Sequence, residues 1–348
     1  MIPRRGRSSS ILSTPNLRMR LLVFFTVSLL VGLASTAPTS NKLDSEKVTV
    51  TSDFFPDEFA IYTAEYDVVN ILIPLNALNF EEDSDDEEKS NSDSTIFFVL
   101  ADNVNGEKVD KGLFIRRKGV VTKLLENGRD AAAANDDTKT AYFAAKDGLY
   151  RYNDKENKAE KYGTIDESIK SIAKVNGSDT IYILTDDNVL YKVTEEGTKK
   201  EKIDSVVNAQ QIILDYENNL YYYTGEKQVY VLGSDGVKKI EGLPQATYIN
   251  ILKPPFILEN GVPVILDRKS YLVYPNGTSE VGDFEFQVRP TAYSMEATLI
   301  QYYAYNKKIY EYNILTLLIG EMLEELREFL GGKSDSISEI ATRSRNDL

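Results

Sequence analysis

Three residue types are missing from this chain of 348 residues: it has no cysteine, no histidine and no tryptophan. Without cysteine it can form no disulfide and has no thiol nucleophile. Without histidine the Ser-His-Asp and Cys-His catalytic arrangements are excluded, and so are the usual zinc, haem and iron–sulfur sites. We therefore expect a binding or structural protein, or an enzyme that works with carboxylates, lysine and tyrosine only.

Positive charge is also in deficit, because 40 basic residues stand against 54 acidic ones and give a net charge of −14. Such a protein repels the phosphate backbone, so we expect no nucleic-acid partner. Paired aspartates such as Asp136-Asp137 and Asp186-Asp187 resemble general acids, but their repetition at turns favours structural hydrogen bonding. No phosphate loop, Rossmann fingerprint or nucleophile elbow occurs. The sequence therefore predicts no enzyme activity, no cofactor and no metal.

The amino terminus carries an apolar run, residues 21–34, which follows Arg18 and Arg20. The run is too short for an ordinary membrane span and is typical of a signal-peptide core. We predict that residues 1–34 are a leader and signal peptide, with Met19 as the alternative start. A membrane anchor and an organelle presequence are the alternatives. Cleavage removes five arginines and leaves a secreted protein of charge −19 with no membrane attachment.

Two glycosylation sequons agree with the secretory route, Asn176-Gly-Ser and Asn276-Gly-Thr. Each is equally an Asn-Gly hairpin turn. The two interpretations are compatible, because oligosaccharides are attached at exposed turns.

Internal periodicity is the strongest signal. Aromatic hairpin residues recur at intervals of 36, 41, 39, 41 and 39 residues, at Phe114, Tyr150, Tyr191, Tyr230, Tyr271 and Tyr310. A β-rich run precedes each of them, at 96–100, 141–145, 181–185, 220–224, 262–266 and 299–305. A third run comes before each hairpin and a more charged fourth run follows, with the first strand the most apolar and the last the most polar. Six such four-stranded units predict an all-β fold, a six-bladed β-propeller over residues 48–313. A two-sheet sandwich is the alternative, but it does not explain the period.

Four further segments complete the predicted organisation. Residues 48–51 alternate like a strand, and we expect them to supply the outer strand of the last blade. Residues 81–95 contain an acidic run that repels itself and predicts a disordered insert, with calcium binding or serine phosphorylation as alternatives. Residues 314–330 predict an amphipathic helix that packs on the propeller or, alternatively, forms a homodimer contact. Residues 331–348 are predicted to be a disordered tail.

A polar residue recurs just before the apolar stretch of each inner strand. These residues are Arg129, Lys170, Gln210, Asn250 and Arg289, with Asn70 in the first blade. Because equivalent positions on inner strands surround the axis, they form a predicted ring with three cations in an acidic protein. We expect the ring to bind a ligand's acid group through Arg129 or Arg289. The alternative is that these residues begin the strands and face solvent. Some tyrosines of 221–223 and 302–303 are expected to line a cavity, and most to lie in the core.

The repeats KDGLYRYN (146–153), DDNVLYKV (186–193) and DYENNLYYYTGEKQVYVL (215–232) resemble the insect ommochrome-binding proteins, which are secreted haemolymph carriers of tryptophan-derived pigments. The resemblance covers residues 55–313. It implies a secreted, non-enzymatic protein that binds a small aromatic anion, an ommochrome, in haemolymph. Two other functions remain open: an extracellular propeller that serves as a platform for protein interactions, and a metal-dependent propeller lactonase.

Overall fold

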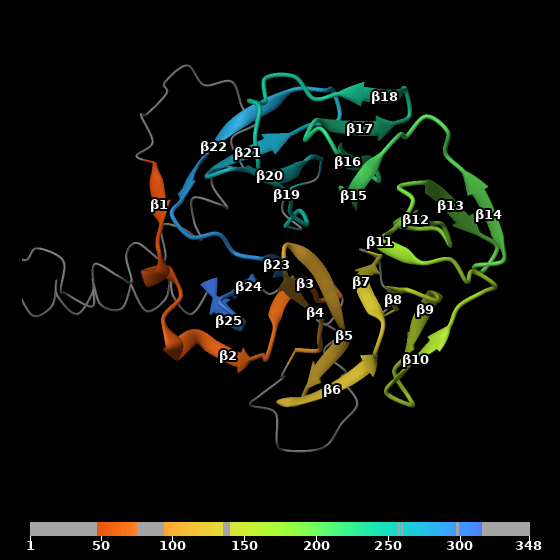
Figure 1. Cartoon of the computed structure of the whole chain (residues 1–348), viewed down its shortest axis with the longest axis horizontal. Helices are drawn as coiled ribbons and strands as arrows, with labels where there is room; N and C mark the ends of the chain where they lie inside the picture. Colours follow the sequence, from red (N-terminus) through yellow and green to blue (C-terminus); the bar gives the residue numbers. More distant parts are fainter. Residues whose placement is uncertain are drawn as a thin grey trace, which may run out of the picture.

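The computed structural model describes residues 47–74, 94–134, 140–255, 258, 260–296 and 299–314. Its strands form six sheets around a central axis (Figure 1). Within each blade the strands of one meander are antiparallel neighbours. The protein is a six-bladed β-propeller, as the 40-residue period predicts.

Each blade has a meander of four antiparallel strands, and the first strand of the meander lies nearest the axis. Blade 1 contains β3 (Asp67–Leu72), β4 (Ile96–Val104), β5 (Glu107–Arg117) and β6 (Val120–Leu125). Blade 2 contains β7 (Gly128–Ala133), β8 (Ala141–Ala145), β9 (Gly148–Asn153) and β10 (Lys158–Lys161). Blade 3 contains β11 (Ile169–Lys174), β12 (Ile181–Thr185), β13 (Leu190–Thr194) and β14 (Lys199–Lys202). Blade 4 contains β15 (Ala209–Leu214), β16 (Leu220–Thr224), β17 (Val229–Gly233) and β18 (Gly236–Lys239). Blade 5 contains β19 (Ile249–Ile251), β20 (Val262–Leu266), β21 (Lys269–Val273) and β22 (Ser279–Phe286). Blade 6 contains β23 (Ala292–Met295), β24 (Ile300–Tyr305), β25 (Lys308–Asn313) and β2 (Ala60–Thr63).

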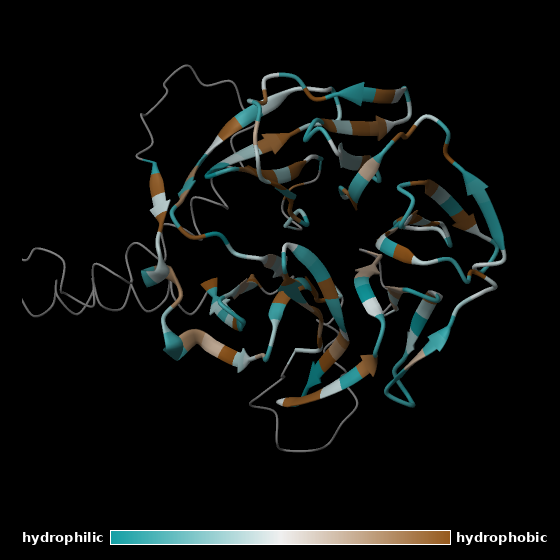
Figure 2. Ribbon diagram, in the orientation of Figure 1, coloured by the Kyte–Doolittle hydropathy of each residue, from teal (hydrophilic) through white to brown (hydrophobic). Residues whose placement is uncertain are grey.

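The burial of the strands follows their place in the blade, with one correction to the expected gradient. In blade 2 the second strand, β8, is buried along its whole length, whereas the first strand, β7, is buried at only half of its residues. The second strand packs against neighbouring blades on both of its faces, while the first also borders the open axis. The outermost strand of blade 3, β14, is exposed throughout and hydrophilic (Figure 2).

The core is divided among the interfaces between blades. A separate cluster of buried apolar side chains fills each of them, for example Phe97, Phe143 and Tyr152 between blades 1 and 2. Phe97 and Phe143 lie 5.2 Å apart between ring centroids, and Tyr152 meets Phe97 edge-on at 4.9 Å. The aromatic residues of the repeats therefore hold blade to blade, which fixes the inner strands around the axis.

The ring closes through a different strand from the one predicted. Strand β1 (Val48–Val50) pairs in parallel with β22 and so adds a fifth strand to blade 5. The outer strand of blade 6 is β2, which pairs antiparallel with β25. Assigning 48–51 to the last blade was therefore wrong, although the amino-terminal part of the chain does close the ring. An alternating edge strand carries no mark of which sheet it joins, and the Ala60–Thr63 segment serves that role equally well.

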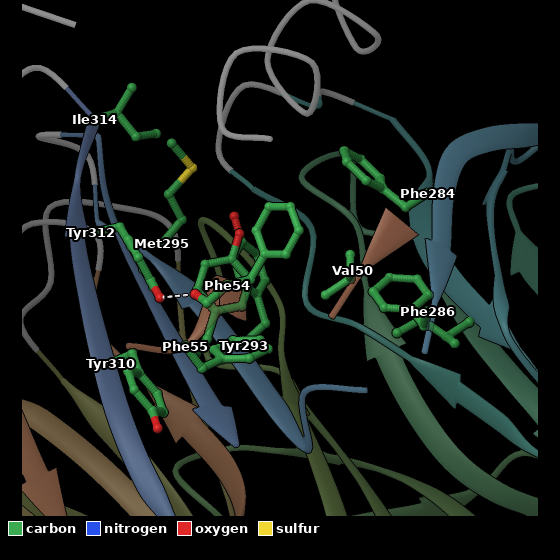
Figure 3. Close-up of a cluster of buried hydrophobic side chains, with 12 residues drawn as sticks. Val50, Phe54, Phe55, Phe284, Phe286, Tyr293, Met295, Tyr310, Tyr312 and Ile314 are labelled. Carbon is green, nitrogen blue, oxygen red and sulfur yellow. Dashed lines mark hydrogen bonds between the residues drawn. The ribbon is translucent and has the colours of Figure 1, made fainter. Parts of the chain in front are cut away.

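The segment between β1 and β2 links blades 5 and 6 through two short 3₁₀ turns, η1 (Ser52–Phe54) and η2 (Asp57–Phe59). Phe54 and Phe55 enter the cluster between these blades (Figure 3). Phe55 stacks on Tyr305 at 4.6 Å, and the Tyr312 hydroxyl donates a hydrogen bond to the carbonyl of Phe54. We call residues 48–63 the N-terminal strap, because they tie the two blades together.

Several predicted segments lie outside the described residues. These are the leader and signal peptide (1–34), most of the acidic insert (81–95), the helix beyond Ile314 and the tail (331–348). In the part of the chain that the structure covers, no helix has the length and hydrophobicity needed to span a membrane.

The two sequons lie in turns, as the Asn-Gly interpretation predicts, since Gly177 and Gly277 both have positive φ. They differ in accessibility. The side-chain amide of Asn176 is partly buried and donates to the carbonyl of Tyr216 at 3.0 Å. Asn276 is exposed, and its Oδ1 accepts from the Thr278 hydroxyl at 2.7 Å within the sequon.

We therefore predict that a glycan is carried on Asn276 and not on Asn176 when the chain passes through a secretory pathway. Intact-mass spectrometry of the secreted protein checks this. Asn276→Gln should remove the glycan mass and Asn176→Gln should leave it unchanged. The reverse pattern, or no glycan on the wild type, would contradict the prediction.

Candidate functional site

A cavity of about 400 Å³ lies on the axis, and all six inner strands or the residues beside them contribute to its wall. The lining residues are 69–71, 129–130, 170–172, 210–213, 250–253 and 291–293, together with Lys108 and Tyr223. The volume falls within the range of pockets that bind small molecules.

Five of the six residues predicted for the axial ring line this cavity: Asn70, Arg129, Lys170, Gln210 and Asn250. The sixth, Arg289, does not. Its guanidinium lies 3.8 Å from the ring centroid of Tyr248, and its Nη1 donates to the carbonyl of Asp267 at 2.9 Å. The inner strand of blade 6 begins only at Ala292, so Arg289 belongs to an exposed loop and Thr291 borders the cavity instead.

β-Bulges divide the ring into two levels. Arg129 is the unpaired residue between the pairs Gly128–Ala145 and Asp130–Ala144, and Lys170 and Gln210 occupy the same position in blades 3 and 4. In blade 1 the bulge is at Val69, so Asn70 aligns with Asp130 rather than with Arg129. Bulges re-aim side chains next to functional sites. The sequence alignment was therefore one residue out of register at Asn70. The same holds for Asn250, because β19 pairs with β20 without a bulge and Asn250 aligns with Ser171 and Gln211.

The upper level is formed by the bulge residues and carries the cations. Arg129 is ion-paired on two sides, with its Nε 3.0 Å from Asp110 and its Nη1 2.6 Å from Asp186. Lys170 donates one hydrogen bond within the described part of the chain, to Asn188, and burial lowers the pKa of Lys170 although the Asp186 carboxylate opposes that shift. An ammonium has three donors. Lys170 therefore keeps two N–H groups for a ligand, whereas Arg129 is already engaged.

The lower level is a set of polar side chains that connect neighbouring blades. Asp130 accepts hydrogen bonds from the Asn70 amide, from the Ser171 hydroxyl at 2.9 Å and from the Ile172 backbone N–H at 2.9 Å. Gln211 repeats the pattern two blades further on, accepting from the Ile251 backbone N–H at 3.2 Å. Burial raises the pKa of Asp130. These contacts serve the assembly of the ring and leave the Asp130 carboxylate little capacity for a ligand.

Lys253 crosses the axis at the lower level, and sequence reasoning missed it. It leaves blade 5 just after β19 and donates to Asn70 Oδ1 at 3.0 Å, to the Ile71 carbonyl at 2.9 Å and to the Ala131 carbonyl at 3.1 Å. All three donors of its ammonium are therefore used, on blades 1 and 2. Burial lowers the pKa of Lys253 to about 8, and the charge of Asp130 opposes that shift.

Lys253 also separates two cavities. A second, smaller cavity of about 80 Å³ continues along the axis beyond the first, and Lys253 lines both. The upper cavity therefore ends at a cation. Its wall holds four basic side chains, Lys108, Arg129, Lys170 and Lys253, against one acidic side chain, Asp130.

The expected aromatic contribution is small. Tyr223 and Tyr293 line the cavity, whereas Tyr221, Tyr302 and Tyr303 are buried in the clusters between blades. Among the described residues no group of three or more acidic side chains is placed to hold a metal ion. The arrangement can bind a small anion next to an aromatic ring.

No family model matches this chain, and no curated protein matches it. Solved structures with a similar fold include the extracellular domain of a hybrid two-component system from B. thetaiotaomicron, at 13% identity and a TM-score of 0.46, over 72% of this chain and 40% of that one. U3-55K matches at 7% identity and a TM-score of 0.47, over 72% of this chain and 97% of that one. PorZ, a surface component of the type-IX secretion system of Porphyromonas gingivalis, matches at 10% identity and a TM-score of 0.45, over 73% of this chain and 38% of that one.

Proposed function

We propose that this protein is a secreted, non-enzymatic carrier that binds a small aromatic anion in the upper cavity. One observation carries the proposal: in a chain of net charge −14, the wall of the cavity is rich in cations, and Lys170 there keeps unused donors. Tyr223 offers a ring on which a flat ligand can stack. The resemblance to ommochrome-binding proteins suggests a pigment of that class as the ligand.

The contacts favour a different binding residue for the ligand's acid group from the ones predicted from the sequence. Arg289 is exposed in a loop and stacks on Tyr248, and Arg129 is held by Asp110 and Asp186. Lys170 is half-buried, faces the cavity and has donors to spare. We therefore assign the ligand's acid group to Lys170.

The prediction is tested with kynurenic acid, a quinoline carboxylate whose fluorescence can be followed without interference because the chain has no tryptophan. Lys170→Gln should weaken binding about tenfold or more, because a hydrogen bond to a charged group contributes about 1.5–3 kcal/mol. Lys239→Gln, at an exposed residue of β18, is the matched control and should bind like the wild type. The methyl ester of the probe should bind weakly and be indifferent to Lys170→Gln.

The pH dependence of the affinity for kynurenic acid tests the same assignment in a second way. Lys170 must be protonated to hold the carboxylate, and its pKa is lowered by burial. Affinity should therefore fall as the pH rises, in a range below the ordinary lysine value of about 10.4. Lys253 also loses its proton in alkaline solution. The contribution of Lys170 is therefore the part of the pH-dependent loss of affinity that is absent in Lys170→Gln. Equal affinity of Lys170→Gln and wild type at neutral pH would overturn this assignment.

The pigment itself has a separate test. Protein purified from its natural fluid should carry an absorption band in the visible region, which the polypeptide alone lacks. Colourless native protein that nevertheless binds kynurenic acid would argue against a pigment while leaving an anion carrier.

A further inference from the structure

The hairpin of β4 and β5 is longer than its counterparts in the other blades, with strands of 9 and 11 residues where β8 and β9 have 5 and 6. The additional part, residues 101–111, reaches the axis, because Lys108 lines the upper cavity. The register shifts between the pairs Leu100–Gly112 and Ala101–Asp110, which leaves Lys111 as the bulge residue, and Gly112 beside it has a φ of +109°. A Cβ at Gly112 would lie 2.6 Å from the Leu125 carbonyl oxygen, so only glycine allows the hairpin to bend there.

Asp110 joins this extension to blade 2. Its side chain is only 5% exposed, and its Oδ2 lies 3.0 Å from Arg129 Nε and 3.5 Å from Lys146 Nζ. The contact is imperfect, since neither Asp110 Oδ1 nor Arg129 Nε has a hydrogen-bond partner among the described residues. A buried carboxylate with an unsatisfied oxygen is destabilised relative to a fully hydrogen-bonded one. Asp110 Oδ1 lies 3.9 Å from Lys108 Nζ. The extension is therefore held by ion pairs of Asp110 with Arg129, Lys146 and Lys108 that are close in space but poorly hydrogen-bonded.

Arg129 lines the cavity, and a carboxylate already occupies it. A carboxylate is also the group that the proposed function assigns to the ligand. We propose that Asp110 is a specificity-determining residue that competes for Arg129 with the acid group of a ligand already bound to Lys170, since both cations line the same cavity. This inference rests on the proposed function. The ligand's acid group takes the place of the Asp110 carboxylate, and the extension moves at Gly112. Because the Asp110 carboxylate is tethered, its effective concentration near Arg129 is high. The cavity therefore binds only those anions that can displace it.

The direct test is Asp110→Asn, which keeps the shape of the side chain and removes its charge. It should bind kynurenic acid about tenfold more tightly than the wild type, because the tethered competitor is weakened. Asp102→Asn is the matched control, since Asp102 lies in the same extension and pairs with Lys111 at 3.7 Å. The gain should disappear in Asp110→Asn/Arg129→Gln. If the wild type binds kynurenic acid and Asp110→Asn binds it no more tightly, the proposed competition is overturned.

A second measurement needs no ligand. Because the chain has no cysteine, Val104→Cys gives a single attachment site for a spin label at the end of β4, where Val104 is 46% exposed. Asp110→Asn should increase the mobility of this label, and Asp102→Asn should not. Unchanged mobility in Asp110→Asn would overturn the role of Asp110 in holding the extension. If neither the wild type nor any variant binds kynurenic acid, the proposed function is overturned. The competition is then overturned as well, whatever mobility the spin label shows.

Discussion

Replacing Lys253 with methionine should lower the free energy of unfolding at pH 7 by about 3–5 kcal/mol, the usual effect of removing one partner of a buried charge pair. The ammonium lies opposite Asp130 and donates to three acceptors on blades 1 and 2. Methionine fills much of the same volume but removes the counter-ion of the buried Asp130 carboxyl group. Urea unfolding followed by circular dichroism measures the loss.

Two further variants separate charge from packing at this position. Asp130→Asn/Lys253→Met should recover part of the lost stability, because no unpaired charge then remains at the axis. Lys239→Met, at an exposed residue of β18, should change stability by less than about 0.5 kcal/mol. If Lys253→Met were no less stable than Lys239→Met, the interaction across the axis would contribute nothing measurable.

A loss of about 3–5 kcal/mol is also expected for Phe55→Ala in the N-terminal strap, since truncating a buried phenylalanine leaves a cavity. Phe55 is 7% exposed and contacts Tyr305 at 4.6 Å and Tyr310 at 5.3 Å between ring centroids. The variant weakens the interface between blades 5 and 6, where the ring closes. Thermal and urea unfolding at matched protein concentration give the measurement.

Phe59→Ala is the matched control for Phe55→Ala. Phe59 lies in the same strap but is only half-buried, and its ring centroid lies 5.0 Å from that of Tyr312. It should lose clearly less stability than Phe55→Ala. Equal losses in the two variants would mean that the strap contributes as a strand alone, without specific packing of Phe55.

The six-bladed architecture could be predicted from the sequence because its signals are local. A hairpin such as 141–153 is specified by its apolar and aromatic runs and by the turn Lys146-Asp147 within a few positions, and its repetition gives the period. The ring positions Lys170 and Gln210 followed from the same spacing. A bulge shifts the register by one residue without changing the local pattern, which is why Asn70 was placed at the wrong level.

The interactions across the axis could not be predicted in this way. Lys174 in blade 3 occupies the position equivalent to Lys253, yet its Nζ donates to carbonyls of its own loop, at Val175 and Ser178. The same residue type at the same point of the repeat therefore has two different roles, decided by which side chains face it from distant blades. The Asp110–Arg129 contact depends likewise on a hairpin length that only one blade has.

The closure of the ring has a consequence for synthesis of the chain. Ala60 pairs with Tyr310, so 250 residues must be translated after Ala60 before its partner exists. At roughly 5–20 residues per second this takes roughly 12–50 s. Throughout that interval Phe54 and Phe55, the most apolar part of the strap, have no blade 6 to pack against. Blades 1 to 4 can assemble in order as they emerge, whereas the amino-terminal strap reaches its partners in blade 6 only when the last hairpin is made.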